Sequence, residues 1–382
     1  MAAVSAPIIE LCRKNKLLNT MMQSLYLSVL KPPSYWDKHA SGTGPESYPP
    51  DGRVHKIKTA FICDEMTWID LSGQCESIFV RPGAWKSQLD EFKPDIFFCE
   101  SAWSGVPPFE GCWRGRIYHN REVFFENRSI LFDILDYCRQ HRIPTVFWNK
   151  EDPIGALDTR FDFADTAIRF DHIFTTARES VDDYKRMGAK SVHVLPFMVN
   201  TAVYYPADEK KDDGRVLFAG AWYDDLPQRC RATRTLFDYA LSKGLRLEVY
   251  DRHSESVEER FKFPKEYAPY IHKAVPAGSV PELMRRYGAA INVNTITDSE
   301  TMFSRRALQL AACGLSVISN PSEAMERALG GRRVTAPNGE TLLIIDANPD
   351  AVRREHAASK AFDYILDTLA GEGVFLPEEV YA

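Results

Sequence analysis

The 382-residue sequence lacks a long hydrophobic run. No stretch approaches the roughly 20 apolar residues that a membrane-spanning helix needs, and the first residues lack the long apolar core of a signal peptide. We therefore expect a cytoplasmic protein with no integral membrane segment. With 45% hydrophobic and 12% aromatic residues, the chain is expected to be globular, and its length favours two domains.

Paired cysteine motifs and an excess of one charge are also missing. The eight cysteines form no Cys-x-x-Cys pair, and several lie inside apolar runs such as "FICDE", so they are expected to be buried free thiols. The formal net charge is only -6, which gives no global field for nucleic acid, and we expect no such partner. Any polyanion must be bound by a local arginine cluster.

Several catalytic motifs are absent from the sequence. There is no Asp-x-Asp pair of the kind that holds a divalent cation against a diphosphate, so no metal and no other cofactor is expected. A Gly-x-Gly-x-x-Gly fingerprint is missing, which disfavours a dinucleotide, and so are the His-Glu-x-x-His, Walker A, Gly-x-Ser-x-Gly and kinase signatures.

Short apolar runs alternate with helix-like segments in two series, which predicts an α/β fold with parallel β-α-β units. The expected strands of the first series are 57–63, 94–100, 144–149, 172–177 and 191–196, and those of the second are 215–220, 245–250, 289–294, 315–320 and 342–346. The charged, proline-punctuated stretch 196–214 separates the two series.

Four regions follow from this pattern. We expect an N-terminal extension (1–55) with a helix around residues 8–30, two α/β domains (56–203 and 204–350), and a C-terminal helix and tail (351–382) that packs back on the first domain.

The stretch "NVNTITDSETMFSRRALQLAACGLSVISN" (292–320) carries the most distinctive candidate site. In open α/β sheets, ligands bind beyond the carboxyl ends of strands, where helix N-termini attract anions. A helix that starts near Phe303 would bring Arg305, Arg306 and Gln309 onto one region of its first turns. Guanidinium groups suit a diphosphate and the amide suits hydroxyls. Solvated arginines on a surface helix are the alternative.

Part of this stretch, "RALQLAACGLSVIS", resembles a segment of GT-B glycosyltransferases, and the residues before it resemble the CgeB-like group. Four further segments are similar to this family: "RVLFAGAWYDDLPQRCRATRTLFDYA", "DHIFTTARESVDDYKRMGAKSVHVLPFMVNTAVYYP", "FFCESAWSG" and "FWNKEDP". The resemblance extends from about residue 57 to residue 330.

The resemblance implies a GT-B architecture, with two Rossmann-like domains whose parallel sheets face each other across a cleft. It makes residues 56–203 the acceptor-side domain and residues 204–350 the nucleotide-sugar-binding domain. It further implies a retaining transferase that uses a nucleotide diphosphate sugar. Gln309 stands where the family usually has a glutamate that bonds the donor ribose, which puts full activity in doubt. The expected donor-binding residues are Gly220, Arg229, Asn294, Arg305, Arg306 and Gln309.

Polar residues at strand ends of the first series are candidates for acceptor binding and catalysis. Lys150, Glu151 and Asp152 directly follow an expected strand, and either carboxylate could orient or deprotonate an acceptor hydroxyl. A solvated turn led by Pro153 is the alternative. Glu100 ends the preceding expected strand and is a further catalytic candidate.

Three more residues complete the candidate set. Asp64 follows the first expected strand and could contact the acceptor or cap a loop. Trp103 could stack on a sugar ring or serve packing alone. His119 lies where related transferases place a loop histidine near the reacting sugar, although a lone histidine is more often structural.

The sequence thus predicts a GT-B glycosyltransferase that moves a hexose-like unit to a hydroxyl acceptor. The acceptor classes left open are surface-polysaccharide precursors, other glycans, lipids, proteins and small molecules. The alternatives are a homologue that binds nucleotide or carbohydrate without transfer, and a sugar-nucleotide epimerase. The sugar, the base and the oligomeric state are not predicted.

Overall fold

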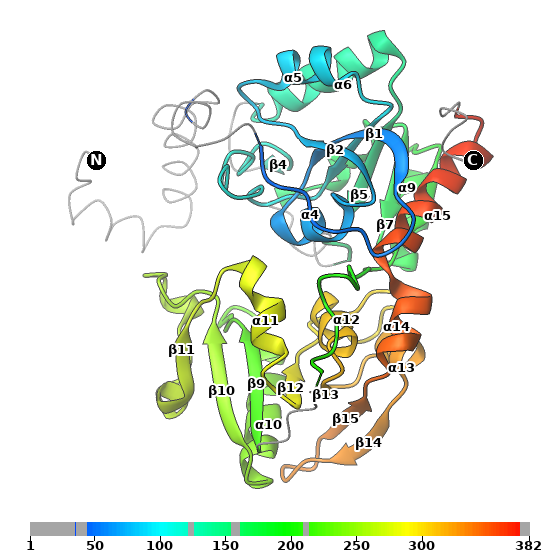
Figure 1. Cartoon of the computed structure of the whole chain (residues 1–382). Helices are drawn as coiled ribbons and strands as arrows, with labels where there is room; N and C mark the ends of the chain where they lie inside the picture. The colour runs from blue at the N-terminus through cyan, green and yellow to red at the C-terminus, as the bar shows by residue number, and fades with distance from the viewer. Residues whose placement is uncertain (1–34, 36–43, 121–125, 154–160, 209–213, 375–382) are drawn as a thin grey trace, which may run out of the picture. The chain divides into compact units, whose positions relative to one another are not determined.

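The structure, a computed structural model, describes residue 35 and residues 44–120, 126–153, 161–208 and 214–374 (Figure 1). These residues form two compact units. The N-terminal unit comprises 44–48, 54–195 and 365–374, and the C-terminal unit comprises 49–53 and 196–364. The helix expected around residues 8–30 lies outside the described residues.

The N-terminal unit is built on a six-stranded parallel sheet with strand order β2-β1-β3-β5-β7-β8 (Figure 1). The strands are β1 (His55–Ile62), β2 (Cys75–Phe79), β3 (Ile96–Glu100), β5 (Thr145–Asn149), β7 (His172–Thr175) and β8 (Val192–Val194). β1 and β3 are neighbours, and the chain continues in opposite directions from them. They therefore flank the topological switch point of this sheet.

Helices and one small hairpin-like pair complete the N-terminal unit. The helices are α4 (Glu65–Leu71), α5 (Trp85–Phe92), α6 (Ser129–His141), α8 (Ala164–Ala167) and α9 (Val181–Arg186), and the last one follows the 3-10 turn η2 (Arg178–Ser180). β4 (His119–Asn120) pairs antiparallel with β6 (Phe161–Asp162). Buried rings on β1, β2, α4 and β3 pack edge-on or tilted against one another and form the core beside β1.

The C-terminal unit has a seven-stranded sheet with order β11-β10-β9-β12-β13-β15-β14 (Figure 1). The strands are β9 (Arg215–Gly220), β10 (Arg246–Asp251), β11 (Ile271–Lys273), β12 (Ala289–Asn292), β13 (Ser316–Ser319), β14 (Arg332–Thr335) and β15 (Thr341–Asp346). The first five in spatial order are parallel, and β15 is antiparallel to both β13 and β14. The switch point of this sheet lies between β9 and β12.

The C-terminal unit also contains helices and short 3-10 turns, and the sequence of α10 explains how that helix begins and packs. The helices are α10 (Pro227–Ser242), α11 (Val280–Met284), α12 (Arg305–Ala312), α13 (Glu323–Leu329) and α14 (Pro349–His356), with the 3-10 turns η3 (Glu259–Phe261), η4 (Lys265–Tyr270) and η5 (Ala277–Ser279). α10 begins with Pro227, whose missing N–H costs nothing at a helix start. Its Leu236, Phe237 and Ala240 are buried in one core with Phe218 of β9.

The chain continues into α15 (Ala358–Gly371), whose residues from Ile365 onward belong to the N-terminal unit. Just beyond this helix, Glu372 accepts hydrogen bonds from two histidines of that unit. The Oε2 atom lies 2.6 Å from Nδ1 of His172, and Oε1 lies 2.8 Å from Nε2 of His193. Burial acts to raise the pKa of Glu372, but hydrogen bonds from Ser191 and the two histidines outweigh it, so the pKa lies below its ordinary value.

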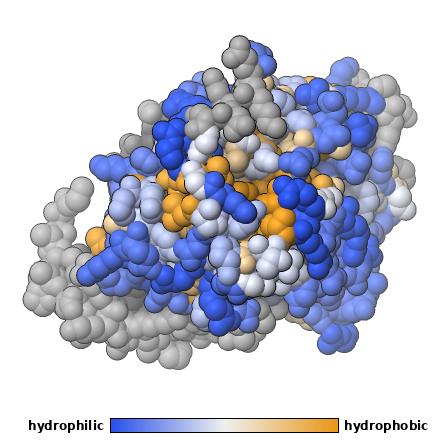
Figure 2. Space-filling model, turned by 90° about the horizontal axis from the view of Figure 1, so that it is seen from below, coloured by the Kyte–Doolittle hydropathy of each residue, from blue (hydrophilic) through white to orange (hydrophobic). Residues whose placement is uncertain are grey.

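The prediction of two α/β units with Rossmann-like parallel sheets is confirmed. The sequence pattern did not predict β2, β11 or β14. In β11 and β14 most residues are exposed, so these strands carry no hydrophobic run. On the face drawn in Figure 2, hydrophobic residues gather near the centre and hydrophilic residues surround them.

Candidate functional site

Each unit brings predicted site residues to the carboxyl end of its sheet, beside the switch point between two strands. In the C-terminal unit these residues are arginines in the first turns of α10 and α12, the helices that follow β9 and β12. In the N-terminal unit they are carboxylates and a lysine after β1, β3 and β5. Helix starts and loops lie at the carboxyl ends of the strands. Their side chains are therefore not needed to pack the faces of the sheet.

Arg229 lies in the first turn of α10 and reaches the end of β12. Its Nη1 donates to the carbonyl oxygen of Val293 at 3.1 Å and to Oγ1 of Thr295 at 2.9 Å. The side chain is half-buried, and desolvation lowers the pKa of Arg229, with the positive charge of Arg252 as a further cause. This guanidinium is therefore fixed at the switch point in surroundings that disfavour its charge.

Arg252, which was not predicted as a site residue, directly follows β10. Its backbone N–H donates to the carbonyl oxygen of Gly220 at 2.9 Å, and its guanidinium donates to Oη of Tyr223. The signal that could have found it was an arginine immediately after a strand of the second series.

Arg305 and Arg306 open α12, which begins at Arg305 and not near Phe303 as expected. Arg305 is buried, with Cζ 4.8 Å from the ring centroid of Phe197. Arg306 is half-buried, and desolvation lowers its pKa, assisted by the positive charge of Arg252. Two cations at the positive end of a helix dipole are unfavourable unless an anion compensates them.

Three arginines of this site have no acidic partner in the part of the chain that the structure describes. Arg229, Arg252 and Arg306 form no ion pair with a carboxylate among the described residues. We name these three residues the arginine cluster. Arg229 and Arg306 are half-buried and Arg252 is exposed, and none of the three is held by an ion pair in the described part of the chain, which suits the binding of an anion.

Gln309 is 1% exposed and faces Tyr204. Its Nε2 donates to Oη of Tyr204 at 3.0 Å. Asn294, also buried, holds the start of α12, because its Oδ1 accepts the backbone N–H of Ser304 at 2.9 Å. Gly220 ends β9, where an added Cβ would lie 2.6 Å from the ring of Phe218. In this structure Asn294 and Gly220 therefore shape the site rather than extend into it.

Asp64, Glu100 and Lys150, which were separate candidates in the sequence, come together in the N-terminal unit. Nζ of Lys150 lies 2.7 Å from Oδ2 of Asp64 and 3.0 Å from Oε1 of Glu100. The Glu100 side chain is 0% exposed and also accepts from Oγ1 of Thr67 and from the backbone N–H of Asp64, each at 2.5 Å. Lys150 thus bridges two carboxylates, of which Glu100 is fully buried and Asp64 is partly exposed.

Asp64 also anchors the loop that follows β3. Its carboxylate accepts the backbone N–H groups of Trp103, Ser104 and Gly105 at 2.9, 2.8 and 2.9 Å. Burial alone would raise the pKa of Asp64, but the Lys150 ammonium and the backbone donors outweigh it, so the pKa lies below its usual value. Asp64 therefore acts as a loop cap, one of its two expected roles.

Glu151 and Asp152 have raised pKa values for the same main reason, desolvation. For Glu151, the Lys150 charge and a hydrogen bond from the Trp103 side chain offset part of the effect. Burial raises the pKa of Asp152 to about 7, although Thr175 and Tyr184 donate hydrogen bonds to it at 2.8 and 2.9 Å. Glu151 is half-buried and Asp152 is 4% exposed, so Glu151 is the more accessible carboxylate.

Trp103 is 37% exposed although its ring is held by other aromatic residues. Its centroid lies 5.5 Å from that of Phe161 and 5.1 Å from that of Phe163, both edge-on, and 5.3 Å from that of Tyr118. A ring held in place while partly exposed can serve as a stacking surface.

His119 lies in a separate ionic network. Nη2 of Arg128 donates to its Nδ1 at 3.2 Å, and Arg128 also pairs with Glu126 and Asp165 at 2.8 and 2.6 Å. The structure thus gives His119 a partner in this network and does not join it to the cluster of Asp64 and Lys150.

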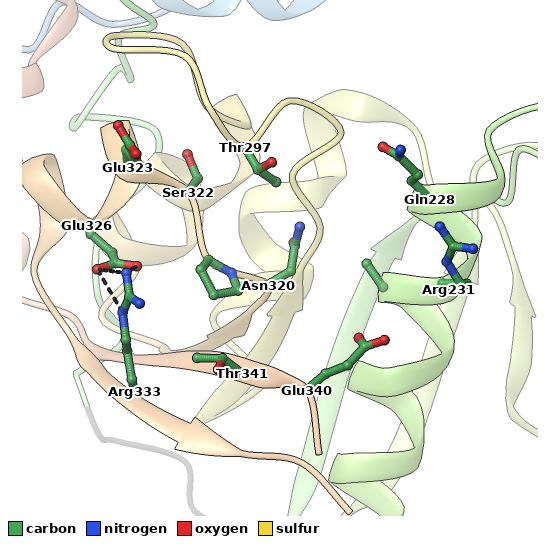
Figure 3. Close-up of a pocket in the computed structure, with 12 residues that line it drawn as sticks. Gln228, Arg231, Thr297, Asn320, Ser322, Glu323, Glu326, Arg333, Glu340 and Thr341 are labelled. Atoms are coloured by element: carbon green, nitrogen blue, oxygen red, sulfur yellow. Dashed lines mark hydrogen bonds and ion pairs between the residues drawn. The ribbon is translucent and has the colours of Figure 1, made fainter. Parts of the chain in front are cut away.

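A pocket of about 380 Å³ lies elsewhere in the C-terminal unit (Figure 3). Gln228 and Arg231 extend into it from α10, opposite Ser322 and Glu323 at the start of α13 (Figure 3). One wall is closed by Arg333, whose Nη2 lies 2.9 Å from Oε1 of Glu326. No predicted site residue lines this pocket.

The described residues contain neither a metal-binding cluster nor a membrane-spanning helix. Among them, no group of three or more His, Cys, Asp and Glu side chains is placed to hold a metal ion. Within the same ranges, no helix has both the length and the hydropathy needed to cross a membrane.

The chain matches no family model and no curated protein. Several solved structures are similar to it at 11% sequence identity. An alpha-glucosyltransferase in complex with UDP and DNA has a TM-score of 0.45, with 85% of this chain and 93% of that chain covered. The T4 phage enzyme BGT, in complex with UDP-glucose, has a TM-score of 0.43, with 83% and 96% covered.

A third similar structure is the UDP-GlcNAc 2-epimerase from Neisseria meningitidis, bound to UDP-GlcNAc. It has a TM-score of 0.41 at 11% identity, with 76% of this chain and 80% of that chain covered. Similarity at this level assigns neither an activity nor site residues to this chain.

Proposed function

We propose that this protein is a GT-B glycosyltransferase that moves a sugar from a nucleotide diphosphate sugar to a hydroxyl acceptor. The observation that carries the proposal is the arginine cluster of Arg229, Arg252 and Arg306. Its three guanidiniums lie at the carboxyl ends of central strands and lack a carboxylate partner among the described residues.

The chemistry of transfer explains why such a cluster is useful. When the bond between sugar and diphosphate breaks, negative charge develops on the leaving diphosphate, and cationic donors that are already in place stabilise it. Desolvation and like charges lower the pKa of Arg229 and Arg306, and a bound anion would relieve both effects. We propose that these arginines take this role without a metal ion.

The acceptor side of the proposal rests on Glu151 and Trp103. Glu151 is the more accessible of the two carboxylates after β5, and its raised pKa brings it closer to the value that a general base or a hydroxyl-orienting group needs near neutral pH. Lys150, Asp64 and Glu100 would position these two residues by fixing the loop after β3. Retention at the transferred carbon is part of the proposal on the family resemblance alone.

Donor binding tests the function directly. Calorimetry with UDP, GDP, ADP, CDP and dTDP, and with their common sugar conjugates, should reveal saturable binding of at least one series. Arg306→Ala should then weaken binding by about 1.5 to 3 kcal/mol, because it removes a charge-assisted bond to phosphate. Arg139→Ala is a matched control, since Arg139 is exposed and pairs only locally with Asp136.

Failure of every nucleotide to bind would contradict the proposal. If Arg306→Ala and Arg139→Ala bind equally well, the arginine cluster is not the phosphate site.

A second candidate function is that of a homologue that binds a nucleotide sugar but does not transfer it. The observation that favours it is Gln309, a neutral amide where the resemblance implies a glutamate. Saturable donor binding without hydrolysis or transfer, over a broad panel of glycan, lipid and small-molecule acceptors, would support this candidate over the first.

A further inference from the structure

Arg252 is held in place by Tyr223, which follows β9. Oη of Tyr223 accepts a hydrogen bond from Nη2 of Arg252, and the same ring lies 5.5 Å from Cζ of Arg229. One tyrosine therefore touches two members of the arginine cluster. Through its hydroxyl it directs one guanidinium, and through its face it supports the other.

Tyr223 itself has a fixed orientation. Its ring packs edge-on against His253 and Phe261, with centroids 5.8 and 5.6 Å away, and these two rings stack at 4.1 Å. Desolvation, followed by the charges of Arg252 and Arg260, lowers the pKa of His253 to about 4, so His253 is neutral at physiological pH. The aromatic support beneath Arg252 is thus uncharged and does not itself neutralise the guanidinium.

The two anchored guanidiniums belong to different strands. Arg229 is bonded to the end of β12, whereas Arg252 continues from the end of β10, and β9 lies between them in the sheet. The two side chains nevertheless meet at one residue, because both guanidiniums contact Tyr223. Each guanidinium fork matches the oxygens of one phosphate group. Two forks held at the same tyrosine therefore suit two phosphate groups that are joined to each other.

We propose that Arg252, positioned by Tyr223, binds one of the two phosphate groups of a nucleoside diphosphate and makes the site prefer diphosphates to monophosphates. This inference rests on the proposed function, because it assumes that the arginine cluster binds a nucleotide. It goes beyond that function by assigning the discrimination between the two ligands to one residue outside α10 and α12.

The test compares affinities for matched nucleotide pairs by calorimetry on the full chain. UDP is paired with UMP, and the adenosine, guanosine, cytidine and thymidine pairs are measured in parallel. In the unmodified protein, the diphosphate should bind at least tenfold more tightly than the monophosphate. In Arg252→Met, this ratio should fall by about tenfold or more, while the monophosphate affinity stays within about twofold.

Two further variants keep the test informative if Arg252→Met folds poorly. Tyr223→Phe keeps the ring and removes only the hydroxyl that directs Arg252, so the ratio should fall severalfold. Arg252→Lys keeps the charge without the fork and should retain part of the preference. Arg260→Met is the control, since this exposed arginine of the same loop pairs with Asp225 and Glu258 and should leave the ratio unchanged.

The outcomes separate this inference from the function on which it rests. If no nucleotide binds to the unmodified protein, the proposed function fails and the inference fails with it. A diphosphate preference that survives in all three variants of Arg252 and Tyr223 overturns the inference and leaves the function standing. Equal weakening of both nucleotides in Arg252→Met would also overturn it, because Arg252 would then not discriminate between them.

Discussion

At the scale of single residues, Gln309 differs most from what its sequence position suggested. The sequence placed it on the ligand-binding turns of a helix, and the resemblance gave it a ribose contact. In the structure its amide is buried and donates to the hydroxyl of Tyr204. A role in ribose binding stays a prediction, and it now has to be separated from the contact with Tyr204.

Substitution of Gln309 can make that separation. In Gln309→Glu, the carboxylate can accept a hydrogen bond from Tyr204, and the neighbouring Arg305 and Arg306 favour its charge, so we expect donor affinity to be kept or increased. Gln309→Ala should lose roughly 1 to 3 kcal/mol of donor binding if the amide bonds the ribose. Calorimetry with UDP and 2′-deoxy-UDP, with thermal unfolding in parallel, checks both variants.

The decisive comparison is between the two ligands. If Gln309→Ala lowers only the unfolding temperature and leaves the affinity ratio for UDP and 2′-deoxy-UDP unchanged, Gln309 serves the contact with Tyr204 and not the ribose. Gained transfer activity in Gln309→Glu would instead favour the second candidate function for the natural sequence.

At the scale of elements, the loop after β3 depends on ionic contacts from two other strands. Asp64 after β1 accepts three backbone N–H groups of this loop, and Lys150 after β5 neutralises both Asp64 and Glu100. The resulting geometry fixes Trp103 relative to Glu151. The loop is therefore ordered by the strands beside it rather than by its own sequence.

Lys150→Met should be strongly destabilising for this reason. The substitution leaves two carboxylates without their cation, one of them fully buried, and breaking a buried ion pair in this way costs about 3 to 5 kcal/mol. Urea unfolding should show this loss, and nucleotide affinity of the folded fraction should change little, because the arginine cluster belongs to the other unit. Lys58→Met is the control, since Lys58 forms an exposed pair with Glu76 and lies 5.6 Å from the ring centroid of Phe92, with no buried carboxylate as its partner in the described residues.

Asp152, which follows β5, makes the free energy of unfolding depend on pH. Its pKa of about 7 in the folded protein lies above the ordinary value of 3.8, so the folded state holds the proton more tightly than the unfolded state. This contribution to stability is fully present below about pH 4 and is lost as the pH rises towards 7. The full loss is on the order of 4 kcal/mol.

Asp152→Asn removes this titration while it keeps an oxygen that Thr175 and Tyr184 can bond. We expect the fall in the free energy of unfolding between pH 5 and pH 8 to be clearly smaller in the variant than in the unmodified protein. Urea unfolding at the two pH values measures it. An identical pH dependence in both proteins would show that Asp152 does not titrate in this range.

At the scale of the whole molecule, both units use the same device, a parallel sheet whose switch point collects polar side chains. The two sets differ in charge. The C-terminal unit presents the arginine cluster, which forms no ion pair with a carboxylate among the described residues, and the N-terminal unit presents two carboxylates paired with one lysine. This division suits a transferase in which one unit binds the anionic donor and the other binds a neutral hydroxyl acceptor.

If arginines stabilise the leaving diphosphate, transfer should not depend on a divalent cation. Activity measured with and without an excess of EDTA should be equal within about twofold, and added Mg²⁺ or Mn²⁺ should not stimulate it. A loss of transfer in EDTA that a divalent cation restores would show that the arginine cluster does not suffice for the leaving group.

The sequence by itself determined the two α/β series, the central strands, and the grouping of Arg305 and Arg306 at a helix start. Buried parallel strands are continuous apolar runs, and these are visible without a partner. Edge strands such as β11 and β14 have no such run, because most of their residues face solvent. They become strands only by pairing with a neighbour.

Only the tertiary structure decided which polar residues meet. Asp64 and Lys150 lie 86 positions apart, and Arg252 joins Arg229 and Tyr223 through the pairing of β9 with β10. The periodicity of a sequence reports which face of an element is buried, but it does not report which loops the sheet order brings side by side. For that reason the sequence identified most members of both clusters as separate candidates and missed Arg252, whose role depends on its neighbours.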